Sequence, residues 1–255
     1  MADFFFNALL GAAAAVEAPV DGQTGVWIKQ GATVISSAMK MQGAVVSSGA
    51  AMYVYNRGSA VSGSIVGSAL VSRGGILSSS WVHNSATISS GGTALHVSVG
   101  GGISGAANPR LTTAQGAVVE YLRLSSAPGA PRGTAWIQQT TASNVIVDGG
   151  YALVRSSAIV SGLTLASSGA AGIQATASAT DIVQNAGAGN VIVEAGASAT
   201  LVTVRAAFYV RGWASALTVE SGGRLFVSSG GTALAVTSSA GATVTVYDGG
   251  HIEYA

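Results

Sequence analysis

The stretch from Ile88 to Val99, Ile-Ser-Ser-Gly-Gly-Thr-Ala-Leu-His-Val-Ser-Val, returns almost intact between Val227 and Ser238. Each copy contains a glycine turn followed by a short run that suits a β-strand. A unit this small cannot bury its own apolar face, so it must stack on neighbouring copies. The repeat therefore predicts an array of coils instead of one compact globule.

A looser form of the unit recurs through the chain: an apolar residue, two intervening residues, and Gly followed by Gly, Ala or Ser. Copies begin at Ile28, Val46, Tyr55, Val71, Ile88, Ile146, Val193, Val219, Val227 and Val246. Gly31 and Gly49 are 18 positions apart and Gly230 and Gly249 are 19 apart. A coil of about 18 to 20 residues is typical of a solenoid, and residues 25–255 then make about a dozen coils.

Between the glycines, apolar residues occupy every second position, as in Ala94–Val99 and Ala242–Tyr247. That period belongs to a strand with one buried face. A disordered Gly/Ser tract would lack this spacing, and the hydrophobic fraction here is 49%. The pattern predicts an all-β fold of stacked parallel strands. We expect five valines to point into the shared core: Val97, Val99, Val236, Val244 and Val246.

The motif Ser-Ser-Gly-Gly-Thr-Ala-Leu-x-Val, at Ser89–Val97 and Ser228–Val236, resembles the repeats of AIDA-type autotransporter passengers, which are bacterial self-associating surface adhesins. The resemblance covers about Gly25 to Ala255 and is strongest at 71–99 and 219–250. It implies a right-handed parallel β-helix exposed on a bacterial surface. In that family a heptosyltransferase modifies serines of the repeats. The resemblance therefore implies glycosylation at Ser89, Ser90, Ser228 and Ser229.

Charged residues make up only 8% of the chain, its net charge is +1, and its lysines and arginines never form a run. This composition argues against a nucleic-acid partner and against polybasic membrane attachment. The chain has no cysteine, which excludes disulfides and thiolate metal sites. No run of about 18 apolar residues occurs, so we expect no transmembrane segment.

Residues 1–24 differ from the repeats because they begin with a strongly apolar run. The most apolar side chains are Phe4, Phe5, Phe6, Leu9 and Leu10. One interpretation is a short helical cap that covers the first coil, because a solenoid must protect its open strand edges. The others are a connector that docks on another subunit and an export signal, although the first basic residue is Lys29.

The stretch 106–144 breaks the rhythm and contains three of the four prolines, Pro109, Pro128 and Pro131. Proline cannot donate to a strand ladder, so it marks loops or strand ends. We expect an irregular insertion here, with a loop near Leu124–Gly133 on one face of the solenoid.

No catalytic or metal-binding constellation is evident. The acids Asp148, Glu194, Glu220 and Asp248 each precede a repeat glycine, where a carboxylate supports a turn. The three histidines lack metal-ligand spacing, and we expect no cofactor. Tyr53 and Tyr55 lie two residues apart on one strand face, and an exposed tyrosine pair can stack on a sugar. These two tyrosines are candidates for a carbohydrate or partner contact.

The sequence favours a non-enzymatic, extracellular or cell-surface β-helix that adheres or self-associates, with itself or surface carbohydrate as partner. Two alternatives remain. One is a subunit of an end-to-end β-helix filament or sheath, because open strand edges can template another copy. The other is a carbohydrate-active β-helix enzyme, which would need a groove with clustered carboxylates.

Overall fold

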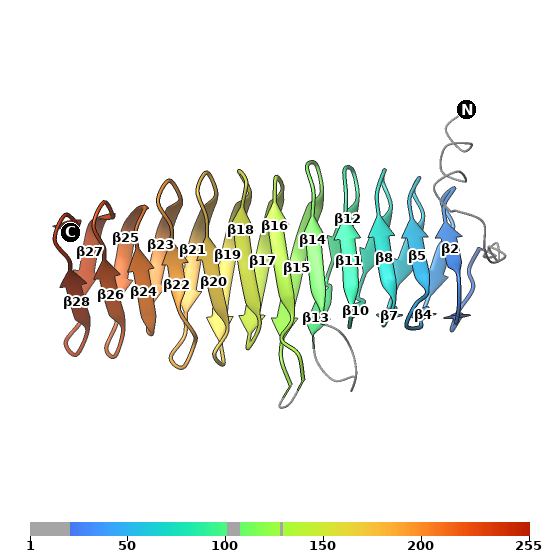
Figure 1. The fold of residues 1–255 in the computed structure, drawn as a ribbon, viewed down its shortest axis with the longest axis horizontal. Helices are drawn as coiled ribbons and strands as arrows, with labels where there is room; N and C mark the ends of the chain where they lie inside the picture. Colours follow the sequence, from blue (N-terminus) through green and yellow to red (C-terminus); the bar gives the residue numbers. More distant parts are fainter. Residues whose placement is uncertain (1–20, 101–107, 128–129) are drawn as a thin grey trace.

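The computed structural model describes residues 21–100, 108–127 and 130–255, and these form an all-β parallel solenoid of the right-handed type with about 12 turns. Figure 1 shows an extended rod with β2 near one end and β28 at the other. The predicted fold class and coil number are confirmed. The expected helical cap and its residues Phe4, Phe5, Phe6, Leu9 and Leu10 lie outside the described residues. Within the described ranges, no helix has the length and apolar character needed to cross a membrane.

One face of the solenoid is a 12-stranded parallel sheet to which each coil contributes one strand. Its strands are β2 (Ala32–Ile35), β5 (Ala51–Val54), β8 (Ser68–Val71), β11 (Ser85–Ile88), β14 (Arg110–Thr113), β16 (Thr134–Gln138), β18 (Tyr151–Arg155), β20 (Ala170–Ile173), β22 (Val191–Val193), β24 (Ala207–Val210), β26 (Arg224–Val227) and β28 (Thr243–Val246).

The remaining strands form a 17-stranded parallel sheet, which in the first coils contains two short strands per coil. Those are β1 (Trp27–Ile28), β3 (Lys40–Gln42), β4 (Val45–Val46), β6 (Ser59–Val61), β7 (Ser64–Ile65), β9 (Ile76–Ser78), β10 (Trp81–Val82), β12 (Thr93–Leu95) and β13 (Ser98–Gly100). Later coils contribute one longer strand each: β15 (Val118–Ser125), β17 (Thr141–Asp148), β19 (Ile159–Ala166), β21 (Ser178–Gln184), β23 (Ser198–Val204), β25 (Trp213–Val219) and β27 (Thr232–Ser238). The last strand is β29 (His251–Tyr254).

Each coil bends in the middle of the 17-stranded sheet at one residue with positive φ. The bend residues include Ser62, Ser79, His96, Tyr121, Asn144, Gly162, Asp181, Leu201, Ala216 and Ala235, with φ between +48° and +74°. The left-handed conformation costs a residue with a Cβ about 1–2 kcal/mol, so glycine alone would be the usual signal. Because most of these residues are not glycine, the bend has no recognisable signal in the sequence.

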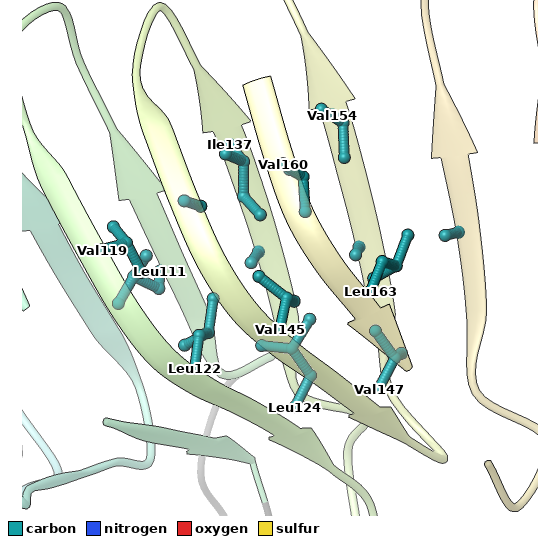
Figure 2. Close-up of a cluster of buried hydrophobic side chains, with 14 of the residues drawn as sticks. Leu111, Val119, Leu122, Leu124, Ile137, Val145, Val147, Val154, Val160 and Leu163 are labelled. Atoms are coloured by element: carbon teal, nitrogen blue, oxygen red, sulfur yellow. The ribbon is translucent and has the colours of Figure 1, made fainter. Parts of the chain in front are cut away.

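The core is a set of ladders in which equivalent apolar residues stack from coil to coil. Figure 2 shows Leu122 and Val145 on adjacent coils, with Ile137 on the opposite sheet closing over the same interior. Val97, Val99 and Val236 are at most 1% exposed, so their predicted inward orientation is confirmed.

The expectation for the last coil needs correction. Val244 is only half-buried, and Val246 is 40% exposed although it stacks on the fully buried Val227 in the ladder. The reason is that β28 has a neighbouring strand on one side only. Register alone therefore does not bury a side chain, because a covering coil is also needed.

The two glycines of each repeat pair are required for different structural reasons. Gly230 adopts φ +77° and has open space where a Cβ would lie, so it is needed for its backbone conformation. Gly231 is needed for close approach, because a Cβ there would lie 2.2 Å from the carbonyl oxygen of Val210 in the coil below. Gly91 and Gly92 repeat this division in the first copy of the motif.

The stretch 106–144 contains strands β14, β15, β16 and β17, which pair in register with their neighbours where the structure describes them. Strand β15 ends at Ser125 and β16 begins at Thr134. Gly133 donates its N–H to the carbonyl of Ser125, at 2.9 Å.

Candidate functional site

One column of side chains on the outer face of the 12-stranded sheet carries no charge along the whole described solenoid. Register relates its twelve members, which are Val34, Tyr53, Leu70, Thr87, Thr112, Trp136, Leu153, Gly172, Ile192, Tyr209, Phe226 and Thr245. We call this column the outer stripe. Because coils stack about 4.8 Å apart, the stripe runs for roughly 50 Å along the rod.

The outer stripe is ordered by contacts between adjacent coils. The rings of Tyr209 and Phe226 stack with centroids 4.8 Å apart and an interplanar angle of 15°. At Gly172 the missing side chain leaves room for two neighbours, because a Cβ there would meet the hydroxyl of Tyr151 at 2.8 Å and Leu153 at 3.3 Å. Burial, and then the nearby charge of Glu194, raises the pKa of Tyr151, so this phenol stays neutral at physiological pH.

The structure places the two candidate tyrosines at different positions of this face. Tyr53 belongs to the outer stripe, whereas Tyr55 begins the turn that follows β5. Both are half-buried. Sequence reasoning did not connect Tyr53 with Trp136, Tyr209 and Phe226, which share its column. Aligning the chain at its turn glycines recovers only part of this column, because the turns before β11 and β24 contain no glycine.

The serines implied as glycosylation sites lie at one corner of the solenoid, in the turns after β11 and β26. Ser90 and Ser229 are exposed, and Ser89 and Ser228 are half-buried. The Ser89 hydroxyl donates to the carbonyl of Val71 at 3.3 Å. Modification of these residues stays a prediction.

His96 is exposed and lies between β12 and β13. It occupies the bend of its coil with φ +52°, and so does its counterpart Ala235 with φ +51°. Its ring stacks on Tyr121, the bend residue of the next described coil, with centroids 4.5 Å apart. The pair is therefore a stacked corner.

Three of the four turn acids form ion pairs with an arginine on a neighbouring coil. Asp148 lies 2.6 Å from Arg123, Glu220 accepts two bonds from Arg205 at 2.7 and 2.9 Å, and Glu194 lies 3.3 Å from Arg211. Across the described ranges, no three His, Asp or Glu side chains are grouped as a metal site requires.

The acids that share a corner are also far from one another. Asp148 and Glu220 share a corner but lie four coils apart, and Glu194 and Asp248 share the other corner three coils apart. At about 4.8 Å per coil, the smaller separation is roughly 14 Å. Paired glycosidase carboxylates lie about 5–9.5 Å apart.

We expect the Asp148 contact to make stability depend on pH. Hydrogen bonds from Ser167 and then Arg123 lower the pKa of Asp148. A carboxyl with a lowered folded-state pKa stabilises the protein above its unfolded pKa of about 3.9, and this contribution disappears as pH falls through the folded value. At pH 7, Asp148→Asn should cost about 1 kcal/mol or less, because the pair is partly exposed. Thermal melts of both proteins should converge below about pH 4, and a constant difference would contradict the assignment.

The fold and this surface define the chain as a parallel β-solenoid with an uncharged outer stripe. No protein-family model matches it, and no curated protein matches it. A similar solved structure is the crystal structure of a TibC-catalysed hyper-glycosylated TibA fragment, with 24% sequence identity and a TM-score of 0.46. The match covers 91% of this chain and 100% of that fragment.

Proposed function

We propose that this protein is a non-catalytic, extracellular or cell-surface β-solenoid that self-associates side by side through its outer stripe. The observation that carries the proposal is the absence of charge along twelve stacked positions, where half-buried aromatic and aliphatic side chains gather. Away from Trp136, whose ring is flanked by Arg110 and Arg155, two such stripes can face each other without desolvating an ion, which is costly unless the ion gains a partner.

The rod shape adds to this tendency. Each coil contributes only a small contact, but the contacts repeat at a fixed spacing along a rigid sheet. Aromatic residues such as Tyr209 and Phe226 supply large apolar area, and area removed from water is worth about 25 cal/mol per Å². The side-by-side contact therefore gains strength with the number of coils engaged.

Three observations support a non-catalytic, surface-exposed role. The turn acids lie in arginine pairs or far apart, and the Ser-Ser-Gly-Gly-Thr-Ala-Leu-x-Val repeat resembles those of bacterial surface adhesins. The chain has no cysteine, so it needs no disulfide outside the cell.

The test is to place charge in the outer stripe and measure association. The double variant Tyr209→Lys/Phe226→Lys should raise the Kd of self-association at least about tenfold, because two apolar contacts become charged. The matched control is lysine at Thr218 and Thr237, which are exposed on the same two coils but on the 17-stranded sheet. Sedimentation velocity over a concentration series measures the effect.

A wild-type protein that stays monomeric at all concentrations would overturn the proposal, as would equal losses in both double variants. Electron microscopy adds the geometry of the contact. Paired rods support the proposal, whereas rods that lengthen along their own axis would support the end-to-end filament instead.

A further inference from the structure

The outer face of the 12-stranded sheet contains an indole enclosed by two guanidinium groups. The Cζ atom of Arg110 lies 4.5 Å from the ring centroid of Trp136, and the Cζ atom of Arg155 lies 4.8 Å from it. Arg110 starts β14, Trp136 is in β16 and Arg155 ends β18, so three successive coils supply the three side chains. We call this group the arginine clamp.

The clamp holds both cations in fixed positions. Each guanidinium stacks on the indole, and the cation–π interaction stabilises it in this position. Arg155 is fixed further by two hydrogen bonds, from Nε and Nη2 to the side-chain oxygen of Gln138, at 3.0 and 2.8 Å. Their strands are two coils apart, so their Cα atoms are separated by about 10 Å along the rod.

Neither cation of the clamp has a carboxylate partner among the described residues, whereas Arg123, Arg205 and Arg211 each have one. The acid that follows Arg155 along the same corner is Glu194, two coils further on, and it pairs with Arg211. Because both guanidinium carbons lie within 5 Å of the same ring centroid, the two like charges are less than 10 Å apart and repel. Each guanidinium also keeps N–H donors that the flat indole cannot satisfy. This arrangement therefore suits an anion supplied by another molecule.

The surroundings of the clamp suit a sugar polymer. Next to Trp136 on the following coil are Leu153 and the phenol of Tyr151, which offer apolar surface for the face of a sugar ring. A shallow hollow of about 440 Å³ adjoins Arg155, and its lining includes the amide of Gln174 and the hydroxyl of Thr176, which can bond to sugar hydroxyls. The carboxylate of Glu194 also lines this hollow, and its charge is compensated by Arg211. The other lysines and arginines are scattered, which disfavours the many phosphate contacts that nucleic acid needs.

We propose that the arginine clamp binds an acidic polysaccharide, whose carboxylate or sulfate groups pair with Arg110 and Arg155 while a ring lies beside Trp136. Guanidinium groups bind carboxylate and sulfate in a bidentate manner, which gives the site its preference for anionic sugars. The clamp adds a ligand to the proposed adhesive role, but it does not depend on self-association.

The experiment titrates dilute monomeric protein with polygalacturonate, dextran sulfate and neutral dextran, using calorimetry at low salt. Wild type should bind one or both acidic polymers and not neutral dextran. Arg110→Gln and Arg155→Gln should each weaken binding about 3- to 10-fold, and the double variant about 30-fold. The preferred polymer distinguishes carboxylate from sulfate recognition.

The control is Arg224→Gln, which removes an exposed cation from the same outer face, away from Trp136, and should change affinity less than about twofold. Arg110 is exposed, so Arg110→Gln should fold normally, and thermal melting verifies this. Equal losses at Arg224, unchanged binding in the clamp variants, or binding of single-stranded DNA as tight as that of the polysaccharides would overturn the proposal. Sedimentation without polysaccharide tests self-association separately, so failure of one proposal is distinguishable from failure of the other.

Discussion

Replacing Val227 by Asp is expected to unfold the protein or cost several kcal/mol, whereas Val246→Asp should cost about 1 kcal/mol or less. The two valines are neighbours in one ladder, but Val227 is 0% exposed and Val246 is 40% exposed. An unpaired carboxylate in the core loses its hydration without gaining a partner, while one on the uncovered coil stays in water.

Chemical denaturation of both variants measures the difference. The pair is matched in residue type, ladder position and substitution, so only the covering coil differs. Equal destabilisation would show that the last described coil is buried in solution, for instance by another chain.

The second large effect is expected at the paired glycines of the repeat. Gly231→Ala should destabilise the protein by about 3 kcal/mol, because its Cβ would lie 2.2 Å from the carbonyl oxygen of Val210 and could be accommodated only by a backbone shift. Gly230→Ala should cost only about 1 kcal/mol, because nothing lies within 4 Å of its Cβ and the penalty is the positive φ alone.

Substitution by asparagine further distinguishes the need for positive φ at Gly230 from the need for close approach at Gly231. Asn tolerates positive φ better than Ala does, so Gly230→Asn should recover part of the lost stability. Gly231→Asn should be at least as damaging as Gly231→Ala, because a larger side chain meets the same backbone. Melting temperatures of the four variants give the comparison, and a reversed order would mean that the roles of the two glycines are exchanged.

The outer stripe and the clamp show why the functional face was harder to predict than the fold. Trp136 follows Thr112 by 24 residues and Leu153 follows Trp136 by 17, yet each pair occupies adjacent coils. Turns and loops change length from coil to coil, while the ladder register stays constant. Residues that share a column are therefore separated by unequal intervals, so no fixed sequence period connects Tyr53 with the rest of its stripe.

By itself the sequence determined the stacked parallel strands, the inward ladders of residues such as Val97 and Val236, and the turns at the paired glycines. These follow from local causes, namely the period of two in a pleated strand and the backbone demands of a tight turn. Only the tertiary structure decided the exposure of Val246, the bends at residues such as Leu201, and the meeting of Arg110, Trp136 and Arg155. Each of these depends on which coil lies above or below, and that neighbour lies 15 to 25 positions away in a sequence whose coils are unequal in length.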